Sequence, residues 1–316
     1  MTGRPVAFRL AGTATRPHRS RREAASDALR RYRTALRLGW LTESNWTDPL
    51  LFLIYSVAKP VASVLILVVM LQVISGGVAP PGSLAFVVVG SSLWAFVMGG
   101  VAGLAWSVLD DRERYRMLKY LYVLPGSLLL LMLGRGTARV AIAAMGAGIT
   151  LALGVVFLGV QFDIGRVDWP LLVISMVLGV VAIVALGIIM AAICLQTRQE
   201  SWSYPEAVAG ALFLVVGAVF PLAVLPAAVQ VIGLLLPLTW WLEGTRRALF
   251  PGAVSAVGGP GSAWGALTGT SVPVREVLLA ALLVTTVMTT LAAVLVYRWS
   301  EHRAKERGLY DQTTGS

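Results

Sequence analysis

The sequence has little charge, one cysteine and almost no histidine. Charged residues make up 13% of its 316 residues, about half of the ~25% that is typical of a soluble domain. Cys194 is the only cysteine, which excludes an intrachain disulfide and a cysteine-based metal cluster. The two histidines, His18 and His302, lie in the basic ends of the chain, where neither is placed for catalysis inside a membrane. These absences argue against an enzyme and against a metal site.

A phosphate-binding loop is also absent. Such a loop needs a Gly-Lys pair followed by Ser or Thr. The chain has three lysines, and the residues that precede them are Ala58, Leu118 and Ala304. If the protein works in an ATP-driven process, the nucleotide must therefore bind to another chain.

Apolar residues are abundant instead, at 57% of the chain. The stretch from Leu84 to Leu109 contains no ionisable residue, and about 20 such residues are enough to cross a bilayer. The net charge of +10 is concentrated at the two ends, with ten arginines between Arg4 and Arg37 and a basic tail after Arg298. Basic ends that flank apolar spans favour the cytoplasm and anionic lipid. We expect membrane lipid, and no nucleic acid, as a partner of these ends.

The pattern predicts an all-α, polytopic membrane protein with six transmembrane helices. The expected divisions are a disordered basic cytoplasmic arm at 1–23, an interfacial amphipathic helix at 24–47, a transmembrane domain at 48–299 and a cytoplasmic tail at 300–316. The expected spans are 50–74, 84–109, 140–160, 171–194, 207–220 and 277–296, and Arg135 and Arg139 are expected at the entry of the third.

Residues 207–242 allow two interpretations, two full spans or one span followed by a re-entrant hairpin. Both ends of the chain are basic, and basic ends prefer the cytoplasm, so the number of crossings must be even. We therefore expect six spans, with 222–242 dipping into the outer face. Both termini are then cytoplasmic.

Lys59 is a charged residue inside the first expected span, next to Pro60. Ionisable groups at this depth serve coupling in ion-driven carriers, so an ATP-independent secondary transporter or channel is the alternative function. A lysine near Pro60 can also snorkel to the interface, and we favour that interpretation because the other spans are nearly free of charge.

A charged block lies between the second and third spans, from Asp110 to Tyr122. Its mixture of charges with tyrosine and leucine suits a short amphipathic helix that a soluble partner could push, with Leu118 and Leu121 as its apolar anchors. An ordinary solvated loop is the alternative. The residues of interest are Asp111, Arg112, Glu113, Arg114, Tyr115, Leu118, Leu121, Tyr122 and Pro125.

Two segments resemble the membrane subunits of type-2 ABC exporters. One runs from Asp111 through Pro125 and is followed by Leu133-Gly-Arg135. The other runs from Val219 to Pro226 and resumes after ten residues at Pro237-Leu-Thr-Trp-Trp-Leu-Glu-Gly-Thr-Arg246. Trp240 departs from the family pattern, where Tyr, His or Ser is more usual, and we interpret it as an interfacial aromatic.

The resemblance implies a permease subunit that moves a hydrophobic drug, a lipid or a glycan out of the cytoplasm. The charged block would be the coupling helix that docks on a separate ATPase subunit, which holds ATP and Mg²⁺, while this chain has no cofactor. Two permease chains, as a homodimer in a bacterial plasma membrane, would enclose the path. The Pro-rich segment would form the re-entrant gate, with Phe220, Pro221, Pro226, Pro237, Trp240, Glu243 and Arg246.

Overall fold

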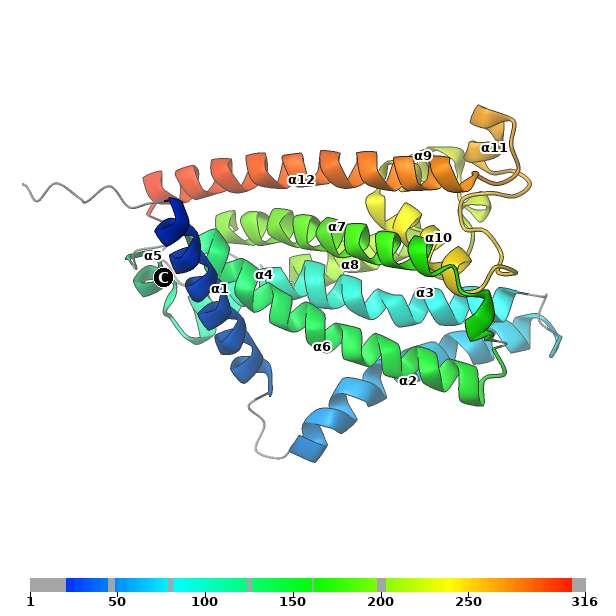
Figure 1. Ribbon diagram of the computed structural model, residues 1–316, viewed down its shortest axis with the longest axis horizontal. Helices are drawn as coiled ribbons and strands as arrows, with labels where there is room; N and C mark the ends of the chain where they lie inside the picture. The colour runs from blue at the N-terminus through cyan, green and yellow to red at the C-terminus, as the bar shows by residue number, and fades with distance from the viewer. Residues whose placement is uncertain are drawn as a thin grey trace, which may run out of the picture.

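A computed structural model describes residues 21–44, 49–78, 82–123, 127–160, 162–197 and 203–308. Every regular element in these ranges is a helix, which confirms the all-α prediction. The long helices run side by side along one axis, and α1 (Arg21–Ser44) crosses that axis obliquely (Figure 1).

Four helical stretches in the described part of the chain are long and apolar enough to cross a membrane. They cover the predicted spans 84–109, 171–194 and 277–296, and they overlap the predicted span 140–160 as far as Phe157. The stretches are Ser83–Arg114, which joins α3 (Ser83–Val97), η1 (Met98–Ala102), α4 (Gly103–Leu109) and η2 (Asp110–Arg114); α6 (Leu128–Phe157); α7 (Trp169–Gln196); and α12 (Arg275–Glu306).

The start of α6 corrects one predicted boundary. We expected the third span to begin at Val140 with Arg135 and Arg139 at its entry, but the helix begins at Leu128 and includes both arginines. Pairing explains the difference, because carboxylates on other helices face these two side chains. The two arginines therefore make the predicted start of this span later than the start of the helix in the structure.

The six-span count stays a prediction. The apolar stretch described in α2 (Pro49–Ile74) is Val61–Ile74, and α8 (Ser203–Val215) has 13 residues; both are shorter than a full span. Beyond η4 (Leu222–Val224), α9 (Ala227–Leu235) and α10 (Pro237–Leu249) meet at an angle of 81°, which suits a broken span as well as a re-entrant loop. Short helices η3 (Ile164–Arg166), α5 (Leu118–Val123) and α11 (Ala263–Thr268) complete the described chain.

The stretch Ser83–Arg114 is the central helix of the bundle. Of its most apolar part, 61% is buried inside the protein, against 22% for α12. Small residues let α7 approach it closely: a Cβ added to Gly187 would lie 2.5 Å from the carbonyl oxygen of Gly100. A movement of this central helix would therefore be felt by the helices packed around it.

α1 packs on the first turns of α6. Gly39 lies over the backbone of Arg135, and Gly134 lies against Ala35, so small residues on both helices allow the close crossing. The Tyr32 hydroxyl donates to Thr137 Oγ1 at 3.0 Å. The predicted amphipathic helix thus has a face that rests on protein, while residues 1–20 lie outside the described part.

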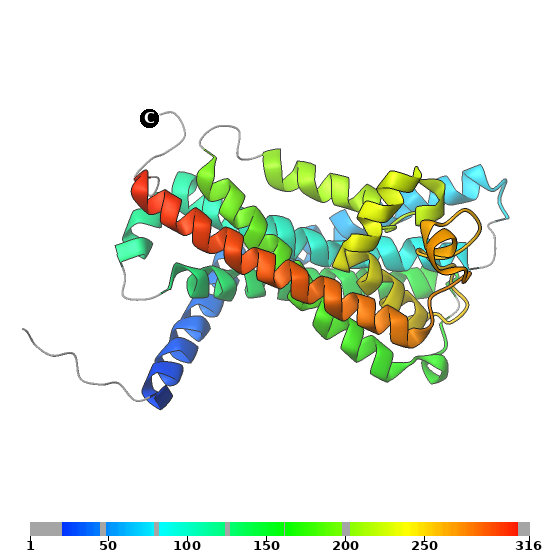
Figure 2. The ribbon, with the colours of Figure 1, turned by 90° about the horizontal axis from the view of Figure 1, so that it is seen from above.

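The bundle has two distinct ends. α1, α5 and the C-terminal turns of α12 lie at one end, which we name the basic end, and α9 and α11 lie at the other, the hairpin end (Figures 1 and 2). Since α1 and the end of α12 lie at the same end of the bundle, the arrangement fits the prediction that both termini are on one side of the membrane.

Cysteine labelling tests this sidedness. We expect single cysteines at the exposed positions Gly165 and Leu267 to react with an impermeant maleimide in intact cells, whereas those at Ser26 and Arg307 react only after permeabilisation. The native Cys194 is buried and provides an unlabelled background. External labelling at Arg307 with Ser26 inside would contradict an even number of crossings, and external labelling at both positions would contradict cytoplasmic termini.

Candidate functional sites at the two ends of the bundle

The charged block at the basic end is not the single amphipathic helix that we predicted. Asp110–Arg114 continues the central helix as a π-helical turn, and only Leu118–Val123 forms a separate helix, α5. Between them Arg116 adopts a left-handed φ of 50°, a conformation that L residues with side chains seldom take. Arg116 therefore marks a sharp break in the block.

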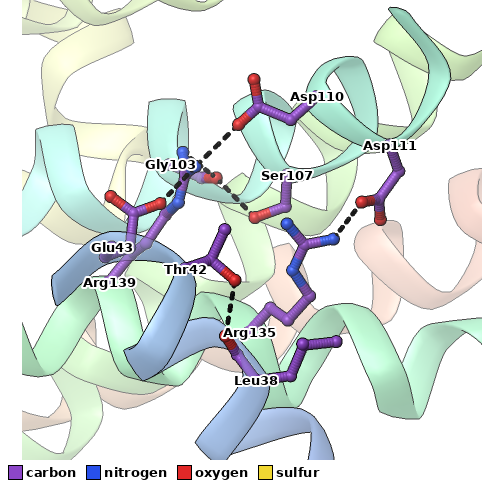
Figure 3. A network of polar contacts seen from close by, with 9 residues as sticks. All are labelled: Leu38, Thr42, Glu43, Gly103, Ser107, Asp110, Asp111, Arg135 and Arg139. Carbon is purple, nitrogen blue, oxygen red and sulfur yellow. Dashed lines mark hydrogen bonds and ion pairs between the residues drawn. The ribbon is translucent and has the colours of Figure 1, made fainter. Parts of the chain in front are cut away.

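A cluster of five charged residues joins three helices at this end (Figure 3). Arg135 pairs with Asp111, and both side chains are 4% exposed. Arg139 lies 2.9 Å from Asp110 and 2.5 Å from Glu43 of α1. We call Glu43, Asp110, Asp111, Arg135 and Arg139 the inner charge cluster.

The inner charge cluster ties the end of the central helix to α6 and α1. Arg139 also donates to the carbonyl oxygen of Gly103 at 3.0 Å, so its guanidinium binds the central helix at two levels. Buried charges persist only when they are paired and hydrogen bonded, and this arrangement meets that condition. The three helices are therefore held together as one unit at the basic end.

Arg112 and Glu113 also face the protein. Arg112 Nη1 donates to the carbonyl oxygens of Cys194 at 3.0 Å and Thr197 at 2.8 Å, and its Nε lies 2.6 Å from Glu113. Cys194 and Thr197 belong to the end of α7, where carbonyl groups lack helical partners and a cation is stabilising. Arg112 thus caps α7 and is not placed to contact a partner directly.

Leu118 differs from its expected role as an exposed anchor. It is 2% exposed and packs in a cluster with Met132, Leu195 and Tyr297. Leu121 is half-buried against the same cluster. The side chain of Tyr122 and the whole of Pro125 lie outside the described part of the chain.

Among the side chains of the block that the structure describes, the exposed ones are Arg114, Tyr115, Arg116 and Tyr120. Tyr115 and Tyr120 are 42% and 66% exposed, and the Arg114 guanidinium lies 5.6 Å from the centre of the Tyr115 ring. Two aromatic rings beside two cations form a surface of the kind that proteins use in contacts with other proteins. Because Arg114 ends the central helix, this surface is continuous with it.

At the hairpin end, Arg246 of α10 is buried with its guanidinium among carbonyl groups. It donates to Gly217 at 2.9 Å, Ala218 at 2.6 Å and Phe86 at 3.3 Å, and lies 3.7 Å from the centre of the Phe86 ring. Gly217 and Ala218 follow the end of α8, so one side chain binds the broken end of α8 to the start of α3.

Glu243 lies one turn before Arg246 and is fully buried. Its carboxylate accepts from Arg247 Nε at 2.7 Å, from the Ser255 hydroxyl at 2.6 Å and from the Ala256 amide at 2.7 Å. The charge of Glu243 is therefore satisfied by Arg247 and by the loop after α10, which it fixes in place.

Trp240 corrects another interpretation, since we expected an interfacial aromatic. It is 3% exposed, donates from Nε1 to the Leu234 carbonyl oxygen at 2.8 Å and packs edge-on against Trp264 with 5.6 Å between ring centres. Its hydrogen bond spans the bend between α9 and α10, so tertiary packing holds it inside. Pro237 opens α10.

Phe220 and two prolines border the turn before α9. Phe220 and Pro221 are half-buried just before η4, and Pro226 precedes α9. Lys59 lies within α2, and its side chain is outside the described part, so its role stays a prediction.

Sequence reasoning missed Gln230 and the inner charge cluster. Gln230 is 4% exposed, donates to the carbonyl oxygens of Leu225 and Gly261, and accepts from the Ala263 amide, so it fastens α9 to the loop before α11. The signal for the cluster was present, since Arg135 and Arg139 share a helix face and Asp110 and Asp111 close the preceding span.

In the described residues all regular elements are helices, and the long apolar ones fit a transmembrane protein. No protein-family model matches the sequence, and no curated protein is significantly similar to it.

Proposed function

We propose that this chain is the transmembrane subunit of an ATP-driven exporter, with the nucleotide bound by a separate ATPase subunit. The sequence supports a separate ATPase because it lacks a Gly-Lys phosphate-binding loop. The motifs from Asp111 to Pro125 and from Val219 to Arg246, which resemble those of type-2 ABC exporters, support the class of machine. The proposed setting is a bacterial plasma membrane with both termini in the cytoplasm.

One observation carries the proposal: the exposed surface at Arg114–Arg116 is the direct continuation of the central helix, the most buried of the four candidate spans. A force that a docked partner applied at Arg114 and Tyr115 would pass directly into the central helix, because Arg114 is its last residue and the Tyr115 amide donates to the Asp110 carbonyl oxygen. The inner charge cluster would pass the same force to α6 and α1, because Asp111 and Asp110 pair with Arg135 and Arg139. The geometry therefore suits a subunit that is driven from the basic end.

The hairpin end supplies the proposed gate. Arg246 and Glu243 hold α10 against α8, α3 and the loop at Ser255. The 81° bend divides this stretch into two short helices, α9 and α10, where a straight span would be one long helix. Irregular backbone at this depth needs burial in protein or an aqueous cavity. We expect two such chains to enclose the export path, and the apolar helices favour a hydrophobic drug or lipid over a glycan.

Removing the aromatic rings of the exposed surface should uncouple the chain. We expect Tyr115→Ala/Tyr120→Ala to fold normally but to lose its ATPase, because aromatic anchors at an interface commonly contribute about 2 kcal/mol or more each. The measurement is ATP hydrolysis and the amount of P-loop protein that co-purifies with the tagged chain from membranes of its own host, together with export. We expect at least a tenfold loss of the co-purified ATPase.

Trp299→Ala is the matched control. Trp299 is 56% exposed at the basic end of α12 but lies outside the charged block, so this variant should keep its partner. If the double tyrosine variant retained its ATPase and its export rate, or if the wild-type chain exported substrate without any P-loop protein, the proposal would be wrong.

A further inference from the structure

A groove at the basic end lies between α1 and the first turns of α6. Its volume is about 350 Å³, which is within the size range of small-molecule sites. Leucines form half of its lining, including Leu128 and Leu131 of α6, and Arg30, Arg31 and Thr34 come from α1. The groove is separate from the exposed tyrosines and from the inner charge cluster.

The groove combines an apolar wall with a cationic rim. The Arg30 side chain is 78% exposed, and the nearest carboxylate oxygen in its ion pair, on Asp27, is 3.8 Å away. Ala35 of α1 and Leu121 of α5 extend the apolar wall. This chemistry matches an amphiphile with an anionic head and a hydrocarbon tail.

The position of the groove favours a bilayer lipid as that amphiphile. Leu128 and Leu131 lie in the first turns of α6, a helix long and apolar enough to cross a membrane. On α1, Leu38 lines the groove and is 40% exposed, and Leu41 is 51% exposed. The wall thus begins where the candidate span begins, and the arginines lie at the end of the bundle, where headgroups would be.

We propose that this groove binds an anionic phospholipid, with its phosphate between Arg30 and Arg31 and the upper part of one acyl chain along Leu128 and Leu131. Guanidinium groups bind phosphate through several N–H donors in a fixed geometry. Burial of the acyl chain adds an apolar contribution that a free phosphate cannot make. The inference depends on the membrane placement of the bundle and not on the ATPase.

Native mass spectrometry of the full-length chain in detergent tests the site. The chain is titrated with palmitoyl-oleoyl phosphatidylglycerol, with the matching phosphatidylcholine, and with inorganic phosphate as a competitor. We expect retention of phosphatidylglycerol over phosphatidylcholine, and a loss of about tenfold or more in that retention for Arg30→Ala/Arg31→Ala, since each basic side chain near anionic lipid strengthens binding about fivefold.

Two further variants separate the groove from general charge. Arg33→Ala/Arg37→Ala removes the same charge from exposed positions of α1 that do not line the groove, and it should retain the lipid. Thr34→Phe places a ring in the groove, and should displace the lipid with all charges intact. The Thr34 hydroxyl binds the Arg30 carbonyl of its own helix, so its loss leaves the packing of α1 on α6 in place.

Each other outcome would overturn the proposal. Equal losses in the two double-arginine variants would indicate a diffuse basic surface, and unchanged retention in Thr34→Phe would place the lipid elsewhere. Competition by inorganic phosphate at the concentration of the lipid would indicate an anion site. These readouts use no ATPase, so they succeed or fail independently of the exporter assignment.

Discussion

Replacing Arg135 with alanine is expected to destabilise the folded chain by about 3–5 kcal/mol. Asp111 is almost wholly buried and pairs directly with Arg135, so the variant leaves a carboxylate inside the protein without its closest cation. The end of the central helix would also lose one of its ties to α6, leaving those that Arg139 makes to Asp110 and Gly103. The midpoint of unfolding in detergent, followed by tryptophan fluorescence, measures the change.

A double-mutant cycle separates the interaction energy of the Asp111–Arg135 pair from the cost of leaving one of the two charges unpaired. Asp111→Asn/Arg135→Met removes both charges and should cost less than the sum of Asp111→Asn and Arg135→Met, because neither side then carries an unpaired charge. Arg30→Ala is the control, since its ion pair with Asp27 is exposed and should contribute less than about 1 kcal/mol. Additive effects would show that Asp111 and Arg135 do not depend on each other.

Arg246 is the second position where a single change should have a large effect. We expect even Arg246→Lys to destabilise the hairpin end by about 3 kcal/mol, because hydrogen bonds to charged groups contribute about 1.5–3 kcal/mol each. Lysine is a point charge that cannot bind the carbonyl groups of Gly217, Ala218 and Phe86 at once or lie flat on the Phe86 ring. Hydrogen exchange should increase at residues 216–226 before it increases in α7 or α12.

Arg166→Lys is the matched control for that experiment. Arg166 lies at the same end, and its pair with Asp163 at 3.2 Å is exposed, so the substitution should leave unfolding and exchange unchanged. Phe86→Leu should give an intermediate effect, since it removes the ring and keeps the backbone carbonyl. Normal exchange in Arg246→Lys would mean that packing alone holds the end of α8 in place.

For the segment from Pro237 to Arg246, the sequence predicted the positions of the residues but not their contacts. Pro237 opens a helix, and Glu243 and Arg246 do lie together with Trp240 on α10. The sequence does not predict their burial. Arg246 donates to the carbonyl groups of Ala218, Gly217 and Phe86, which lie 28, 29 and 160 positions away from it along the chain. A pattern of residue types identifies such positions but not the atoms that they bind.

Hydropathy by itself determined the all-helical class and the positions of α7 and α12. Both are long, apolar and nearly free of charge within the span, so a helix is the structure that satisfies their backbone groups in a membrane. The expected ranges 171–194 and 277–296 lie inside α7, Trp169–Gln196, and α12, Arg275–Glu306. Local composition is enough to predict a helix whose residues do not depend on partners far away in the sequence.

Only the tertiary structure decided what the charged and aromatic residues do. The sequence predicts that Arg135 and Arg139 flank a span, but carboxylates on η2 and α1 let them lie within α6. It predicts that Leu118 faces outward, but this side chain packs against helices that come later in the chain. A buried charge is stable only with its partner, and a leucine is exposed only if nothing covers it; both conditions depend on residues far away in sequence.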